Sequence, residues 1–335
     1  MTKPRILLVA TGGTIASAEE GNGLTPQLTG EQLAGYVPQA AELADIDIVQ
    51  PMNIDSTNMR PADWQAIGDA ILARYEDYDG FVVLHGTDTM AYTAAALSYL
   101  IQDSPRPIVL TGSQQPMGSP FTDARINLYQ SVLYAADPAS RDVTVVFGGK
   151  VVAGTRARKQ RTMSFNAFTS VNYPELALIR NDRIIRTAPA GAETGRSAAE
   201  PRVYHDLDER VFVLKLTPEV NPSVFELLRR DYDAIILETF GIGGIPNTLH
   251  DAIFGWVDSG RTLVVTTQVP EEGLDLGVYE VGRAYAEHPG ILKGADMTCE
   301  ALVAKTMWAL GQTREPARLR ELFYEPINCD RLPEA

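Results

Sequence analysis

The chain has 335 residues, 45% of them hydrophobic, and a formal net charge of −14. This length suits one large or two medium domains with a full buried core. The negative charge argues against a nucleic-acid-binding surface, which needs a basic face, although a small zwitterionic substrate can bind in a site that sets its own local field.

The first half of the chain alternates short β-branched runs with helical stretches. Strands are predicted at residues 5–9, 46–49, 81–84, 107–110 and 143–147. Helical spacing is shown by Trp64, Ile67, Ile71 and Tyr75. Two further helices are predicted at residues 89–101 and 124–136. Apolar strands that alternate with helices are typical of a parallel sheet covered on both faces.

The pattern changes at residues 187–210, which are rich in Ala, Gly, Glu and Pro and lack apolar periodicity. Such a stretch is typical of a linker. Beyond it, strands are predicted at 211–216, 234–237 and 262–267, and helices at 222–230, 249–259 and 299–310. We therefore predict an N-terminal domain at 1–190, a linker at 191–210 and a smaller C-terminal α/β domain at 211–335.

Cysteine content and hydropathy bear on the compartment. Cys299 and Cys329 are too few for a disulfide framework and too far apart for a CxxC motif, which favours reduced thiols. The chain begins with an apolar stretch too short for a signal peptide, and no run approaches the ~18 apolar residues of a membrane span. We expect a cytoplasmic protein that makes no membrane contact.

Polar clusters follow four successive strands of the predicted sheet. They are TGGT at 11–14, NIDSTN at 53–58, HGTDT at 85–89 and TGSQ at 111–114. Ligands of open parallel sheets bind beyond the carboxyl ends of the strands, where several such clusters share one crevice. Helix capping alone is the competing interpretation, but capping needs one such residue per helix rather than a cluster at each end.

The first cluster lies within the stretch VATGGTIAS and has three interpretations. A phosphate cradle is disfavoured because GxGxxG and GxxxxGK[ST] are both absent. A purely structural turn remains open. For a nucleophile, Thr14 supplies the hydroxyl, and Gly12 and Gly13 let a ligand approach the backbone closely.

Two basic residues are candidate partners for that hydroxyl. His85 is the only one of the four histidines that adjoins a cluster, and a structural role is favoured for it over a Ser-His-Asp triad. Lys159 lies in the basic run 156–161, which fits either a solvated face or a lysine that burial makes able to accept a proton. No His/Cys spacing indicates a metal, and no cofactor is expected.

Several of these segments resemble one known family. TGGTIAS and HGTDT are similar to the two signatures of the bacterial-type L-asparaginase family, and DSTNMRPADW, LTGSQQP, FTSVNY, YEVGRA and GADMT resemble further family segments in the same order. The start without a leader resembles the cytoplasmic type I branch. The resemblance implies a larger N-terminal flavodoxin-like parallel-sheet domain, which would carry the catalytic site, and a smaller C-terminal α/β domain.

The resemblance also implies a reaction, the hydrolysis of the side-chain amide of L-asparagine to L-aspartate and ammonia, and it allows minor L-glutaminase activity. Thr14 would be the nucleophile that forms a β-aspartyl ester. Thr87, Asp88 and Lys159 would form a polar relay beside the scissile amide.

The same comparison assigns the substrate-binding residues. Ser56, together with Asp55, would hold the α-carboxylate, and Asp88 would accept the α-ammonium group. The neighbouring substrate-binding positions are Thr57, Gly86 and Thr87. Hydroxyls and backbone N–H groups can satisfy a carboxylate without an arginine. Family members pair so that one subunit closes the site of another, which implies a homodimer or homotetramer with sites near the subunit interfaces.

The sequence departs from the family at two positions. Leu24 stands where relatives often carry a tyrosine on a mobile hairpin, so that either another residue would activate Thr14 or the rate would be low. Gly244 stands where some relatives carry an asparagine that contacts substrate. Two alternatives stay open: a related subunit that releases ammonia for glutamyl-tRNA, which normally has an extra domain before TGGT, and a silent amino-acid sensor.

Overall fold

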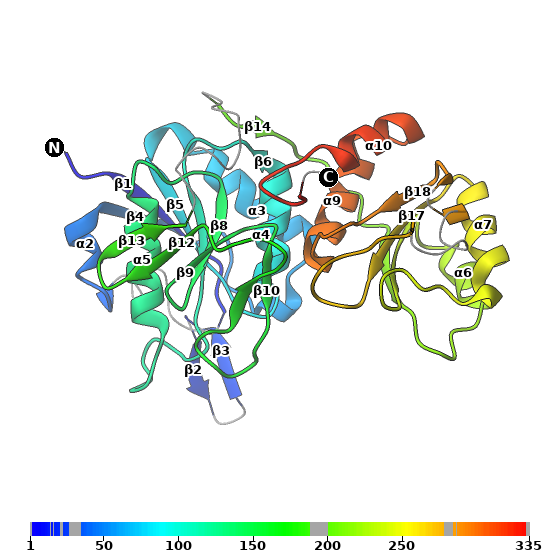
Figure 1. Cartoon of the computed structure of the whole chain (residues 1–335). Coiled ribbons are helices and arrows are strands. Elements are labelled where there is room, and N and C mark those ends of the chain that lie inside the picture. The colour runs from blue at the N-terminus through cyan, green and yellow to red at the C-terminus, as the bar shows by residue number, and fades with distance from the viewer. Residues whose placement is uncertain are drawn as a thin grey trace. The chain divides into compact units, whose positions relative to one another are not determined.

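The computed structural model describes residues 2–13, 15, 17–20, 23–26, 35–187, 200–277, 284–285 and 287–332. The chain divides into two compact units. The first comprises Met1–His205 with Ile327–Cys329, and the second comprises Asp206–Pro326 with Asp330–Ala335. In Figure 1 the first unit runs mainly from blue to green, and the second mainly from yellow-green to red.

A mixed sheet forms the centre of the first unit. Its described strands stand in the order β13 (Arg183–Arg186), β12 (Ala177–Arg180), β9 (Lys150–Ala153), β8 (Val143–Phe147), β7 (Ile108–Thr111), β5 (Gly80–Leu84), β1 (Arg5–Ala10) and β4 (Asp45–Val49). Strands β4, β1, β5, β7 and β8 are parallel, and β9, β12 and β13 extend the sheet with antiparallel pairings. Numbered along the chain, the parallel strands follow the order 2-1-3-4-5. This is the order of a flavodoxin-like domain, which is the fold that the family resemblance implied.

Helices cover both faces of this sheet (Figure 1). Helices α2 (Ala40–Leu43) and α5 (Ala124–Ala135) pack together on one face, and α3 (Pro61–Leu72) and α4 (Met90–Leu100) pack together on the other. The residues predicted at helical spacing are buried, although Tyr75 lies in the short 3-10 helix η3 (Tyr75–Asp77) after α3 has ended. Ten of the eleven residues of α4 are buried, as expected for a helix that is apolar on all sides.

Short strand pairs complete the first unit. Strands β2 (Ser17–Glu20) and β3 (Gly23–Pro26) form a hairpin in which Leu24 stands opposite Glu19. Strands β10 (Ala157–Lys159) and β11 (Phe168–Ser170) form a second antiparallel pair, with Lys159 opposite Phe168.

Part of the predicted linker at 191–210 belongs to the first unit. Residues 188–199 lie outside the described residues, but β14 (Arg202–Val203) pairs with β6 (Ile101–Gln102). The Arg202 guanidinium also binds the Asp103 carboxylate at 2.8 Å. Two paired residues are too few to show a periodicity, which explains why the sequence pattern did not indicate this strand.

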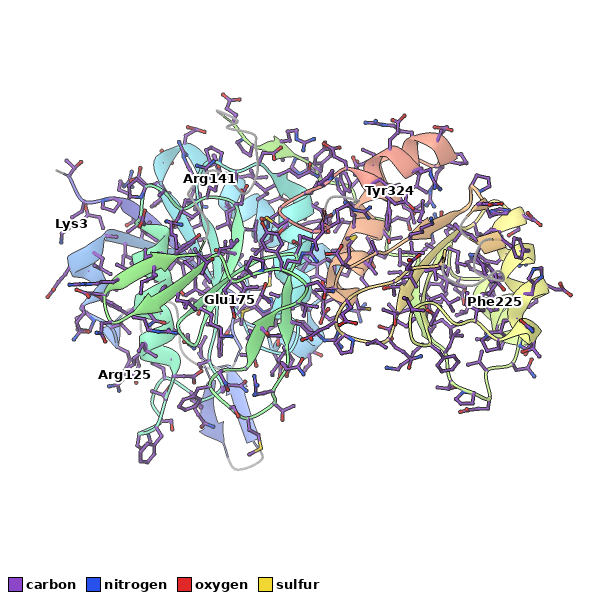
Figure 2. The ribbon with its side chains drawn as sticks, viewed as in Figure 1. Lys3, Arg125, Arg141, Glu175, Phe225 and Tyr324 are labelled. Carbon is purple, nitrogen blue, oxygen red and sulfur yellow. The ribbon has the colours of Figure 1, made fainter. Side chains whose placement is uncertain are left out.

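The second unit has its own parallel sheet, with strands in the order β15 (Val211–Lys215), β16 (Ala234–Thr239), β17 (Thr262–Thr267) and β18 (Ile291–Lys293). Its helices are α6 (Ser223–Leu228), α7 (His250–Asp258), α9 (Cys299–Gln312) and α10 (Pro316–Tyr324). Phe225 of α6, labelled in Figure 2, meets Trp256 of α7 edge to face with ring centroids 6.4 Å apart. The predicted smaller α/β unit is thus present, with β18 as a short additional strand.

In the parts of the chain that the structure describes, no helix combines the length and the apolar character needed to cross a membrane.

A buried ion pair joins α9 to the C-terminal segment of the second unit. Lys305 and Asp330 are both fully buried, and the Lys305 ammonium also donates to the Glu325 carbonyl at 2.6 Å. Burial lowers the pKa of Lys305 to about 8, although the Asp330 carboxylate opposes this effect. The pair therefore contributes to stability only while both partners are present.

We expect Lys305→Met to lower the free energy of unfolding by about 3–5 kcal/mol, because Asp330 would keep a buried charge without its cation. The double variant Lys305→Met/Asp330→Leu is expected to retain most of the wild-type stability. Urea unfolding of the wild type and both variants measures this. A single variant with the wild-type midpoint would contradict the expectation.

Candidate active site

The four polar clusters meet at one edge of the first sheet. The parallel registers pair Val9 with Val49, Ala10 with Leu84, and Leu84 with Thr111, so that β4, β1, β5 and β7 end side by side. The strand order reverses direction at β1, which is the position where open α/β sheets bind their ligands. Thr14, the predicted nucleophile, lies outside the described residues.

Three of these strand ends touch through glycines. Gly13 has a φ of +82°, and a Cβ added there would lie 2.3 Å from the Cα atom of Gly86. A Cβ added to Gly86 would lie 2.4 Å from the Ser56 hydroxyl oxygen. No side chain fits at either position, and a positive φ independently favours glycine at 13. The Gly-Gly turn is therefore required structurally, and it brings the chain next to Gly86 and Ser56.

The turn that carries Ser56 is fixed at both ends. Asp55 caps the 3-10 helix η2 (Ser56–Asn58), because its Oδ1 atom accepts from the backbone N–H of Thr57 at 2.9 Å and from the Thr57 hydroxyl at 3.0 Å. The Thr89 hydroxyl donates to the Ser56 carbonyl at 2.8 Å. Ser56 is almost completely buried, and its hydroxyl oxygen lies beside Gly86.

Lys159 joins the cluster from the β10–β11 pair. Its ammonium donates to the Thr87 hydroxyl oxygen at 2.7 Å and to Asp88 Oδ1 at 2.6 Å. The Lys159 side chain is 17% exposed, whereas that of Asp88 is 58% exposed. The structure thus brings the three predicted relay residues into contact, and the ammonium is directed into the cluster rather than onto a solvated face.

Gln114 extends this chain of hydrogen bonds, and the sequence analysis did not select it as a site residue. The Thr87 hydroxyl donates to Gln114 Oε1 at 3.2 Å, while Gln114 Nε2 donates to the carbonyls of Arg161 at 3.4 Å and Ser164 at 3.3 Å. Because an ammonium can only donate, Thr87 accepts from Lys159 and directs its own proton toward Gln114. Membership of the TGSQ cluster was the only sequence signal, since an amide carries no charge.

Asp123 and Asn127 hold the loop that carries Gln114. Asp123 is 3% exposed, and its carboxylate accepts from the backbone N–H groups of Gln114 at 3.0 Å and Gln115 at 3.1 Å. The Asn127 amide donates to the same carboxylate at 3.1 Å, and Asn127 Oδ1 accepts from the Gly148 N–H at 3.1 Å. These bonds bind the loop after β7 to α5, which fixes the position of Gln114.

His85 has a structural environment, as expected. It is fully buried, with Nδ1 2.7 Å from the Gly86 carbonyl oxygen and Nε2 2.9 Å from the Thr93 hydroxyl. A carbonyl only accepts, so Nδ1 carries the proton and Nε2 accepts from Thr93. Burial lowers the pKa of His85 to about 4, which keeps the imidazole neutral.

The described residues contain no group of three or more His, Cys, Asp or Glu side chains placed to hold a metal ion.

We expect His85 to weaken the fold in acid. The unfolded chain binds a proton at this position below pH 6.5, but the native state does so only near pH 4, so stability is lost as the pH falls between these values. The wild type should lose about 3 kcal/mol more unfolding free energy than His85→Asn between pH 7 and pH 4. Denaturant unfolding of both proteins at pH 7 and pH 4 measures this loss of unfolding free energy.

His205→Asn is the matched control for this prediction, because the His205 side chain is 67% exposed. This control variant should lose as much stability in acid as the wild type. Equal losses for the wild type and His85→Asn would contradict the assigned role of His85.

Two family descriptions match the chain: "Asparaginase, N-terminal" matches residues 5–190, and "Glutaminase/Asparaginase C-terminal domain" matches residues 210–323. An L-asparaginase of Thermococcus kodakarensis is 38% identical over 96% of this chain and 98% of its own length. The solved structure of the thermostable L-asparaginase from that organism has a TM-score of 0.89 at 36% identity, and the match covers 98% of this chain and 100% of that one.

Two further relatives bear on the choice of function. L-asparaginase 1 of Escherichia coli strain K12 is 34% identical, with 100% of both chains covered. A glutamyl-tRNA(Gln) amidotransferase subunit of Aeropyrum pernix is 35% identical over 95% of this chain and 77% of its own length. Both family descriptions and these identities over nearly the whole chain establish that the protein belongs to the asparaginase family of amidohydrolases and resembles its type I members.

Proposed function

We propose that this protein is an L-asparaginase, which hydrolyses the side-chain amide of L-asparagine to L-aspartate and ammonia. The observation that carries the proposal is the contact of Lys159 with both Thr87 and Asp88 at the carboxyl edge of the sheet. The names of the Thermococcus kodakarensis and Escherichia coli relatives support the same activity.

The crevice offers separate positions for the two charged groups of the substrate. Only Asp88 Oδ1 contacts Lys159, and more than half of the Asp88 side chain is exposed, which leaves the carboxylate accessible to an α-ammonium group. The Ser56 hydroxyl, beside Gly86, donates to the α-carboxylate. Asp55 supports this contact indirectly by capping the turn, and Thr57 belongs to the same capped turn.

The chemistry takes two balanced steps. The Thr14 hydroxyl oxygen bonds to the side-chain carbonyl carbon of the substrate, the C–N bond breaks, and ammonia leaves with the hydroxyl proton. This step forms a β-aspartyl ester on Thr14. Water then adds to the ester carbon, the bond to Thr14 breaks, and L-aspartate leaves as the threonine hydroxyl is restored.

Proton movement in both steps is assigned to Thr87, Lys159 and Asp88. Thr87 Oγ1 already accepts from Lys159 and donates to Gln114, so one lone pair remains to accept a hydrogen bond from the hydroxyl of the nucleophile or from water. Leu24 has no hydroxyl to contribute from the hairpin, so the relay of Thr87, Lys159 and Asp88 activates Thr14. Gln114 acts as a positioning residue because it directs the Thr87 proton away from the reacting atoms.

The proposal extends to a second substrate, the oligomeric state and the location of the protein. Minor L-glutaminase activity is included, because one methylene separates L-glutamine from L-asparagine and typically changes the binding free energy by only ~1–3 kcal/mol. A homodimer or homotetramer is favoured by large exposed apolar side chains of the first unit, such as Phe121 at 84% and Met163 at 83% exposure. A cytoplasmic location is favoured by the low cysteine content.

We expect the purified protein to release ammonia from L-asparagine, and Thr14→Ala to lower this rate by at least about 1,000-fold, because the ester step loses its nucleophile. Thr217→Ala, at an exposed position of the second unit, is the matched control and should keep the wild-type rate. Ammonia release from L-asparagine and L-glutamine is measured for each protein.

Other results of this experiment would favour one of the two alternative functions or contradict the role of Thr14. Tight asparagine binding by calorimetry without ammonia release would favour the amino-acid sensor. Ammonia release that requires a co-purifying amidotransferase subunit would favour the transamidation role. The Aeropyrum pernix relative is named as such an amidotransferase subunit. Undiminished activity of Thr14→Ala would contradict the nucleophile assignment.

We expect Gln114→Met to lower kcat about tenfold and to change KM by less than about twofold, because Gln114 orients Thr87 and does not touch the substrate. Gln115→Met is the matched control, since its exposed side chain lies next in the chain. Steady-state kinetics on L-asparagine measure both variants. An unchanged kcat for Gln114→Met would contradict the positioning role.

A further inference from the structure

A cavity of about 570 Å³ lies at the amino edge of the sheet in the second unit. Its walls include the residues that directly precede the four parallel strands, namely Arg210, Asp233, Arg261 and Gly290. The register pairs Val211 with Ala234 and Ala234 with Thr262, so the preceding residues line up across the edge. The volume falls within the range of small-molecule sites.

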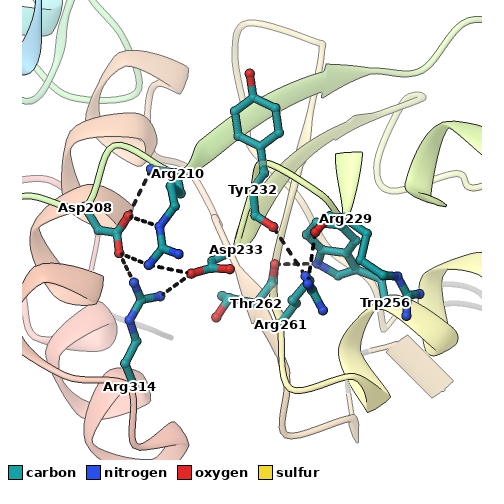
Figure 3. Close-up of polar contacts among 9 residues, drawn as sticks. All are labelled: Asp208, Arg210, Arg229, Tyr232, Asp233, Trp256, Arg261, Thr262 and Arg314. Atoms are coloured by element: carbon teal, nitrogen blue, oxygen red, sulfur yellow. Dashed lines mark hydrogen bonds and ion pairs between the residues drawn. The ribbon is translucent and has the colours of Figure 1, made fainter. Parts of the chain in front are cut away.

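One side of the cavity carries a ring of ion pairs that balances its own charge (Figure 3). Arg210 contacts Asp208 at 3.2 Å and Asp233 at 2.8 Å. Arg314 also contacts both carboxylates, with 3.1 Å to Asp233. Two guanidinium groups thus share two carboxylates, and the ring contributes no net charge to the cavity.

Arg261 is a different case, because its partners are neutral. Its guanidinium donates to the carbonyls of Tyr232 at 3.3 Å and Arg229 at 3.0 Å, and to the Ser259 hydroxyl at 3.0 Å. In Figure 3 these carbonyl contacts lie apart from the ring of ion pairs. Among the described residues no carboxylate pairs with Arg261, and two of its five N–H groups are left over by these bonds.

The position of Arg261 is well defined. The three neutral acceptors hold its planar fork, and the guanidinium carbon lies 5.4 Å from the centre of the Trp256 ring. A cation held in this way loses little side-chain entropy when it binds an anion. Its charge is therefore held at a fixed place in the wall of the cavity.

The remaining wall is mainly apolar. It includes the side chains of Val257, Leu292, Leu310 and Leu319, which are all buried. His288 stands at the same wall with its ring oriented, because Nδ1 accepts from the Gly290 N–H at 3.1 Å and Nε2 lies 3.4 Å from Asp258 Oδ1. The cavity thus combines a fixed cation with a surface suited to an apolar group.

We propose that this cavity is a binding site for a small amphipathic monocarboxylate. The carboxylate of the ligand pairs with the free donors of Arg261, and its apolar body packs against Val257, Leu292 and Leu319. The balanced ring of Arg210, Arg314 and their two carboxylates closes the polar side without competing for the anion. The inference uses residues of the second unit alone and does not depend on the proposed amidohydrolase reaction.

The test uses 4-phenylbutyrate as the probe and the uncharged 4-phenylbutanamide as its matched control, both titrated into the full-length protein by calorimetry. We expect the carboxylate to bind at least tenfold more tightly than the amide. Arg261→Gln should weaken binding of the carboxylate at least tenfold. Equal affinity for the two probes, or no heat of binding at probe concentrations up to about 10 mM, would overturn the proposal.

A second variant keeps the test decisive if Arg261→Gln fails to fold. Leu319→Trp places a larger side chain in the cavity and leaves Arg261 intact, so it too should weaken binding of 4-phenylbutyrate at least tenfold. Thermal melting of each variant establishes that it is folded before titration. Unchanged binding by a folded Leu319→Trp variant would locate the probe elsewhere and overturn the proposal.

Discussion

The close approach of three strand ends in the first unit is the constraint on which the rest of the candidate site depends. Gly13 lies against Gly86, and Gly86 lies against the Ser56 hydroxyl, at separations that leave no room for a Cβ. A side chain at either glycine would separate the loops after β1, β4 and β5. Backbone contact therefore sets the spacing of the crevice, and the polar side chains of the site are placed by it.

Hydrogen-bond direction then organises the polar side chains. Lys159 can only donate and the Gln114 amide oxygen can only accept, so the Thr87 hydroxyl between them has a single orientation. Gln114 keeps its own place because buried Asp123 holds the loop that carries it. One polar chain thus links β10, the turn before α4 and the loop after β7, which makes the arrangement rigid before any substrate binds.

The sheets of the two units differ in how charged side chains are paired at their edges. At the carboxyl edge of the first sheet, Lys159 and Asp88 form an ion pair and compensate each other. At the amino edge of the second sheet, Arg210 is compensated by carboxylates, whereas Arg261 is held only by neutral acceptors. A cation positioned without a counter-ion attracts an anion from solution, and this difference is the physical basis of the ligand site proposed there.

The alternation of strands and helices, the parallel sheet covered on both faces and the clustering of polar residues at four strand ends were all predictable from the sequence, because periodicity and strand–turn composition are local properties. The flavodoxin-like architecture of the first unit came from the family resemblance. The family resemblance implied that Lys159 lies with Thr87, 72 positions away, and the structure shows their contact. That Gln114 completes the hydrogen-bond chain, and that β14 belongs to the first unit, could be seen in the tertiary structure alone. The role of Thr14 stays a prediction. Contacts between segments that are distant in the chain depend on the path of the whole backbone. A local pattern of residues does not specify that path.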